Sequence, residues 1–116
     1  MQRVVRIPTL PENPLQASAD FYCSHLAMVT DGLAGNATSL AIVFPPASHA
    51  HRGWRRAAIA NLAREFAPVR VNGIAGSEGE ALSAALAWLG HSPGVTGQLL
   101  GLYGQSEECE AYSPDE

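Results

Sequence analysis

Positive charge and long apolar stretches are both scarce in this sequence of 116 residues. It has 7 basic against 11 acidic residues, a net charge of −4, and no basic tract, so we expect no binding to nucleic acid. No apolar run approaches the ~20 residues that a membrane-spanning helix needs, so we expect no membrane association. Arg3 and Arg6 interrupt the N-terminal segment where a signal peptide would have its apolar core, which predicts a cytoplasmic protein.

Cysteine is scarce as well. Cys23 and Cys109 lie far apart and belong to no CxxC pair. They cannot form the disulfide framework of a small secreted domain, and we expect both thiols to be free. Apolar residues, in contrast, make up 47% of the sequence. A domain of this length buries roughly 65% of the surface that its unfolded chain exposes, which is enough for one hydrophobic core.

Short apolar runs alternate with segments of helical spacing. The runs predict strands at residues 3–7, 40–44, 69–74 and 95–102. The segments between them predict helices at residues 13–33, 51–67 and 78–89, the first of which begins with an Asn-Pro pair suited to a helix start. The order β-α-β-α-β-α-β predicts an α/β fold with a four-stranded parallel sheet. Residues 1–104 would form this domain, and the acidic residues 105–116 a flexible tail.

Two neighbouring segments resemble the C-terminal half of short-chain dehydrogenases/reductases. Residues 63–76, AREFAPVRVNGIAG, are similar to the family's segment LA.E.AP..IRVN.I.PG. Residues 84–100 are similar to its closing helix and strand, with WL in the helix and VTGQLL in the strand. The resemblance implies a truncated Rossmann-like sheet with helices on both faces: the first two helices on one face and the third on the other.

The residues with which that family holds its dinucleotide are not found. The family places the pyrophosphate at a Gly-rich turn between its first strand and first helix, where backbone N–H groups face the ligand. Gly73, Gly76 and Gly79 have a GxxGxxG spacing. They follow a segment that matches a later strand of the family, so we interpret them as turn and helix-entry glycines and expect no cofactor.

The catalytic Tyr-x-x-x-Lys pair of the family is also not found. Counting back from the matched segment places Ser48 at the tyrosine position and Arg52 at the lysine position. Serine has no phenol that could serve as acid or base near neutral pH, whereas arginine stays charged and can still bind an anion. Ser48 can equally be a turn or cap residue. The family's substrate loop is reduced to residues 77–79, so no lid encloses a substrate.

Several histidines allow other interpretations. His49 and His51, together with His25 and Cys23, could contribute to a metal site, but no third ligand has convincing spacing. Ser48 beside the two histidines could suggest a hydrolase, but the G-x-S-x-G motif is missing. We therefore expect histidines that face solvent in a loop, and no metal.

A basic cluster, Arg52, Arg55 and Arg56, stands at the start of the second predicted helix. Positive charge at a helix N-terminus opposes the helix dipole. The cluster is therefore interpreted as a solvated helix face, with an anion or the acidic tail as alternative partners.

The first predicted helix has two apolar stripes. The stripe assigned to the core consists of Leu15, Ala19, Tyr22, Leu26, Val29 and Leu33. The opposite stripe would face water in a monomer and consists of Ala17, Phe21 and Met28. In the family that the chain resembles, the corresponding helices pack against their twofold mates as a four-helix bundle, which implies a homodimer.

The second predicted helix adds small residues to the same predicted interface. Ala57 and Ala60 lie away from its core positions, with Trp54 at their edge as an anchor. For Phe21 and Met28, cover by a loop of the same chain is the alternative. The predicted function is a non-catalytic, dehydrogenase-like domain that acts through self-association or a protein partner. The alternative is an oxidoreductase-like binder of nucleotides or small molecules, completed by a separate cofactor-binding chain.

Overall fold

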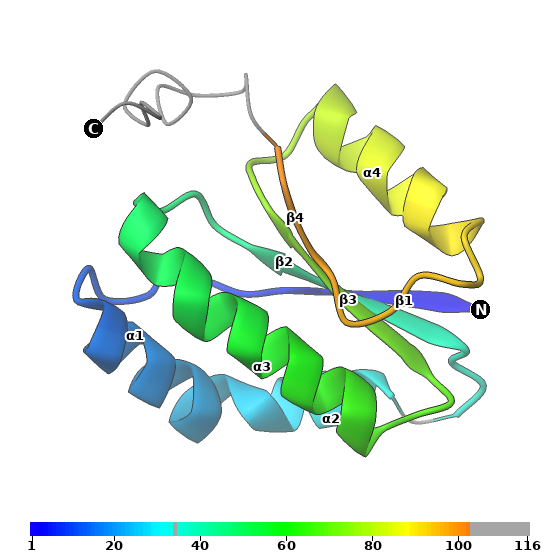
Figure 1. Ribbon diagram of the computed structural model, residues 1–116, viewed down its shortest axis with the longest axis horizontal. Coiled ribbons are helices and arrows are strands. Elements are labelled where there is room, and N and C mark those ends of the chain that lie inside the picture. The colour runs from blue at the N-terminus through cyan, green and yellow to red at the C-terminus, as the bar shows by residue number, and fades with distance from the viewer. Residues whose placement is uncertain (34, 103–116) are drawn as a thin grey trace.

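Four parallel strands form one sheet in the computed structural model, which describes residues 1–33 and 35–102 (Figure 1). The strands are β1 Gln2–Arg6, β2 Ser39–Phe44, β3 Arg70–Ala75 and β4 Leu99–Gly101. Their order in the sheet is the order of the sequence, so each strand pairs with the next one through a helical crossover. The predicted α/β fold with a four-stranded parallel sheet is confirmed. The tail predicted at 105–116 lies outside the described residues.

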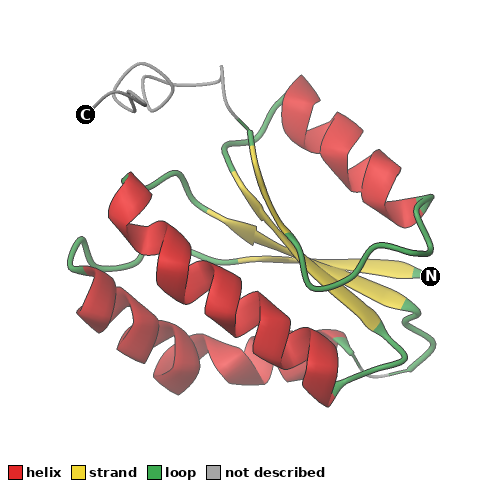
Figure 2. Cartoon of the chain, viewed as in Figure 1, coloured by secondary structure: helices red, strands yellow, loops and turns green. Residues whose placement is uncertain are grey.

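Helices cover both faces of the sheet (Figure 2). The helical elements are α1 Pro14–Asp20, the π-helical turn η1 Phe21–His25, α2 Leu26–Gly32, the 3-10 turn η2 His49–His51, α3 Arg52–Glu65 and α4 Glu80–Gly90. The α1–η1–α2 run and α3 lie side by side on one face, and α4 covers the other, as the resemblance implied. Within residues 1–33 and 35–102, none of the helices combines the length and apolarity needed to span a bilayer.

The strand β2 lies at the centre of the core. All of its residues are buried, as its unbroken apolar run predicted for a strand covered on both faces. Leu40, Ile42 and Phe44 pack on the α3 side, and Ala41 and Val43 on the α4 side. Both helical layers are thus held to the sheet by alternating side chains of one strand.

The helix α3 approaches β3 closely at a glycine. A Cβ atom added to Gly73 would stand 2.9 Å from Cγ1 of Ile59, closer than real Cβ contacts come. Ile59 is fully buried at this point. Gly73 is therefore a packing position inside β3, and its interpretation as a turn or helix-entry glycine is corrected.

A π-helical turn, η1, divides the first helical run. A π turn holds one residue more than an α turn, so it shifts the helical faces before it relative to those after it. After η1, the core positions follow the predicted stripe, because Val29 is fully buried and Leu26 and Leu33 pack against the same cluster. The predicted stripe is therefore correct in α2.

Before η1, the predicted stripe is wrong by one residue. Leu15 and Tyr22, which were assigned to the core, are 80% and 41% exposed. Ala17 and Phe21 are fully buried instead. They cannot contribute surface to a contact between copies, and the prediction that they belong to a dimer interface is corrected.

The last strand is shorter than the predicted run 95–102. Residues 95–98 form a loop that bonds to β3 both through backbone groups and through the side chain of Asn72. The Asn72 amide donates to the carbonyl of Val95 at 3.0 Å, and its Oδ1 accepts from the N–H of Gln98 at 3.0 Å. Gly97, at φ 76°, makes the turn within this loop.

Candidate functional site

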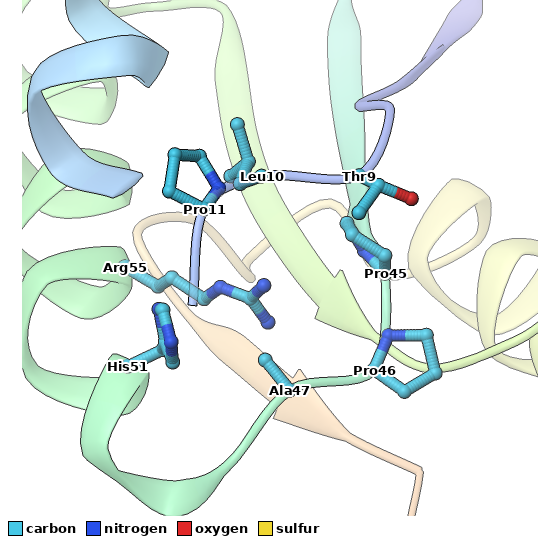
Figure 3. Close-up of a pocket in the computed structure, with 8 residues that line it drawn as sticks. All are labelled: Thr9, Leu10, Pro11, Pro45, Pro46, Ala47, His51 and Arg55. Atoms are coloured by element: carbon cyan, nitrogen blue, oxygen red, sulfur yellow. The ribbon is translucent and has the colours of Figure 1, made fainter. Parts of the chain in front are cut away.

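A cavity lies at the carboxyl ends of β1 and β2 (Figure 3). Its volume is about 210 Å³, and it is enclosed by the loop after β1, the loop after β2 and the first turns of η2 and α3. The lining residues are Thr9, Leu10, Pro11, Pro45, Pro46, Ala47, His51 and Arg55. Proline cannot donate to a strand ladder, so Pro45 ends β2 where the cavity begins.

Arg55 supplies the positive charge of the cavity. Its side chain points into the cavity (Figure 3), and the whole residue is only 3% exposed. The guanidinium carbon lies 4.7 Å from the centroid of the Phe44 ring and 5.8 Å from that of Trp54. Cation–π contacts of this kind partly replace the water that the buried charge has lost.

The burial of Arg55 corrects the interpretation of the arginine cluster as one solvated face. Arg52 and Arg56 are exposed, as that interpretation expected, but Arg55 faces the core. Helical spacing accounts for this position, because residues 55, 59 and 62 fall on one stripe of α3 and all three are buried. That spacing is visible in the sequence, so the stripe was the signal that could have identified Arg55.

His51 is a structural residue of the cavity wall. It is 4% exposed, so the expectation of a histidine facing solvent is wrong at this position. The indole N–H of Trp54 donates to His51 Nδ1 at 3.1 Å. His51 Nε2 in turn donates to the carbonyl oxygen of Glu12 at 2.8 Å. With one nitrogen accepting and the other donating, the ring is neutral and has a fixed orientation.

These hydrogen bonds also bear on two other roles considered for His51, the base of a hydrolase and a metal ligand. Its acceptor nitrogen is occupied by Trp54, so it cannot serve as the base that activates Ser48. His25 lies 3.6 Å from Asp20, away from the cavity. Within the described ranges, no three His, Cys, Asp or Glu side chains are placed to hold a metal ion together.

Ser48 and Arg52 lie at the entrance to α3. Ser48 is exposed and precedes the η2 turn, where its carbonyl oxygen accepts from the His51 N–H at 3.1 Å. Arg52 is the exposed first residue of α3. Neither residue is part of the cavity lining. The sequence also contains no lysine, because all 7 basic residues are arginine.

The residues predicted to form a dimer interface divide into three environments. Ala17 and Phe21 are in the core, as described above. Trp54 is half-buried and packs with its ring centroid 5.6 Å from that of Phe21, so much of its ring belongs to the core of its own chain. Met28 and Ala57 are exposed, and Ala60 is half-buried. The outward face of the helices is therefore not the predicted one, but it is apolar as well.

The loop that leads into α4 is fixed by an ion pair. Nε of Arg6, at the end of β1, lies 2.6 Å from Oε2 of Glu78. The bond to Arg6 lowers the pKa of the Glu78 carboxyl and keeps it charged. Glu78 and Glu80 thus place negative charge at the start of α4, the helix end at which a phosphate would otherwise be favoured.

Comparison with known proteins agrees with the fold. The family model of SDR-like proteins, described as short chain dehydrogenase-like protein, matches residues 5–102. No curated protein and no solved structure matches the chain. The matched range covers all the described elements from the end of β1 to β4. The chain therefore belongs to the SDR-like family of short chain dehydrogenase-like proteins.

Proposed function

We propose that this chain is a non-catalytic member of the SDR-like family that acts through self-association. The residues at the family's catalytic positions support the proposal that the chain is non-catalytic. Counting back from the matched segment assigns Ser48 and Arg52 to the family's tyrosine and lysine positions, and a serine cannot transfer a proton as a phenol does. No lysine elsewhere in the sequence can take the second role. The family's proton chemistry therefore has no residues to perform it.

The observation that carries self-association is the exposed apolar surface of the α1–η1–α2 run. The exposed apolar residues that form it, referred to together as the outer face of the run, are Leu15, Ala19, Tyr22 and Met28. Leu15 is 80% exposed, Tyr22 41% and Met28 39%. At positions as exposed as these, a polar side chain would not disturb the packing of the core. Apolar surface gathered on one helical run is typical of an interaction site.

A second copy of the chain is the occupant that suits this face. The run lies beside α3 on one face of the sheet (Figure 1), so two copies related by a twofold axis would bring four helices together. On α3, Gly53 and Ala57 are exposed and small, and they allow another helix to approach closely. A standard interface of this kind would bury about 1,600 Å² in total.

Sedimentation of charged variants tests the proposal. We expect the wild-type chain to sediment as a dimer at micromolar concentration, and Leu15→Asp with Tyr22→Asp to sediment as a folded monomer. The matched control is Trp88→Asp, which charges an apolar residue that is 54% exposed on α4, on the opposite face of the sheet. This control should remain a dimer. A wild-type chain that is monomeric at high micromolar concentration would rule out the proposal.

The cavity supports the alternative, a small-molecule binder completed by a separate cofactor-binding chain. It lies at the carboxyl ends of parallel strands, where open α/β sheets bind their ligands. In this case the chain alone would have weak or no affinity for nucleotides, and a second chain would confer it. Nucleotide binding that appears only when a cofactor-binding second chain is added is therefore the measurement that separates the two functions.

A further inference from the structure

We propose that the cavity at the ends of β1 and β2 is a binding site for a small organic monocarboxylate, held by Arg55. We refer to it as the Arg55 cavity, lined by the eight residues given above. The inference concerns a different surface from the outer face of α1–η1–α2. It does not depend on self-association.

The position of the Arg55 cavity is set by the topology. β1 and β2 are adjacent and parallel, so the loops that follow them leave the sheet side by side, at the carboxyl ends of the strands. Pro45 and Pro46 turn the second loop away from the strand direction, and Thr9 to Pro11 do the same for the first (Figure 3). The space between diverging loops at the carboxyl ends of parallel strands is open to a ligand.

The charge in the Arg55 cavity is positive. Arg55 is the charged member of its described lining, since His51 is neutral and the other lining residues carry no charge. Arg55 as a whole is buried, and its guanidinium stays protonated at neutral pH. Walls of proline, leucine and alanine keep the local dielectric low, which strengthens attraction between Arg55 and an anion.

The shape and chemistry of the cavity favour a carboxylate over a phosphate. A guanidinium presents its N–H donors as a planar fork that matches the two oxygens of a carboxylate. One arginine balances one negative charge, and the apolar walls suit a hydrocarbon remainder. The volume of about 210 Å³ lies below the ~300 Å³ at which drug-sized pockets begin, so the ligand must be small.

Benzoate and benzamide form a matched pair of probes, because they have nearly the same shape and only benzoate is charged. We expect the wild-type chain to bind benzoate at least tenfold more tightly than benzamide in isothermal titration calorimetry. Arg55→Met should remove that preference, because methionine keeps the length and the contact with Phe44 but not the charge. Arg55→Lys should weaken benzoate binding by several fold, because it keeps the charge and loses the fork.

Arg56→Met is the control for these variants. It removes the same charge from the neighbouring residue of the same helix, but Arg56 is exposed and does not line the cavity. We expect it to bind benzoate as the wild type does. If Arg56→Met and Arg55→Met weakened binding equally, the attraction would be that of the whole basic cluster and the proposal would be wrong.

A measurement on the wild type keeps the test independent of the stability of the variants. Benzoate should shift the backbone amide resonances of Thr9, Leu10 and Ala47 in a saturable way, whereas benzamide should not. Saturable shifts that are equal for both probes, or that are confined to other parts of the chain, would overturn the assignment. The same would follow from an absence of shifts at millimolar benzoate.

Discussion

At the scale of single residues, aromatic side chains on the α3 side of the sheet pack ring against ring. Phe21 lies at their centre, with its ring centroid 5.4 Å from Tyr22, 5.7 Å from Phe44 and 5.6 Å from Trp54. Trp54 is joined in turn to His51 by a hydrogen bond. The aromatic cluster around Phe21 is therefore linked, through His51, to the lining of the Arg55 cavity.

We predict that Phe21→Ala destabilises the chain by about 3–5 kcal/mol, the usual cost of deleting a buried aromatic ring. Urea unfolding at low protein concentration measures this loss. Trp88→Ala removes a larger ring from a site that is 54% exposed, and it should cost less than about 1 kcal/mol. If Phe21→Ala unfolded at the wild-type urea concentration but no longer self-associated, Phe21 would belong to an interface and not to the core.

At the scale of elements, the sequence predicts the number and type of strands and helices but not their faces throughout. The run 40–44 and the prolines and glycines around the strands are local signals, and the structure has strands close to where those signals place them. The core face of the first helix depends on one additional residue in η1, which no local signal marks. A stripe counted back from Val29 at regular helical spacing reaches Tyr22 and Leu15, whereas the π turn puts Phe21 and Ala17 in those places.

The site was less predictable than the fold. The resemblance directed attention to Ser48 and Arg52, the positions of the family's catalytic pair, and neither lines the Arg55 cavity. Six of the eight lining residues come from two loops, residues 9–11 and 45–47, which are brought together only by the pairing of β1 with β2. Arg55 shares helical spacing with Ile59 and Leu62, and this spacing predicts that it is buried. Arginine is so rarely buried that its charge favours the opposite interpretation, an exposed residue.

The short β4 gives a prediction at the scale of elements. Asn72 is 1% exposed, and its side chain makes two hydrogen bonds to the backbone of the loop before β4. Asn72→Ala removes both bonds, each of which contributes about 0.5–1.5 kcal/mol. We expect faster hydrogen exchange at the Gln98 amide than in the wild type. Asn36→Ala, which alters an exposed asparagine before β2, should leave that exchange rate unchanged.

At the scale of the whole molecule, the sheet and helices keep the family's architecture while the loops carry different chemistry. The loops after β1 and β2, residues 7–13 and 45–48, contain no glycine that could let a backbone approach a pyrophosphate. The third loop has Gly76 and Gly79, but Glu78 and Glu80 place negative charge beside it.

From this distribution we predict that the chain alone binds neither NAD nor NADP. Isothermal titration calorimetry should give no saturable heat at nucleotide concentrations up to the millimolar range. Saturable binding at micromolar concentration would contradict the prediction. Benzoate, titrated into the same sample, serves as the positive control if the Arg55 cavity binds carboxylates.

The sequential strand order has a consequence for how the sheet meets other chains. In the described residues its two edges are β1, which carries Arg3 and Arg6, and β4, which has only three residues. A strand with charged side chains and a strand of this length are both poor templates for adding a foreign strand. The sheet is thereby protected against edge-to-edge pairing, so the proposed self-association would have to use the helices.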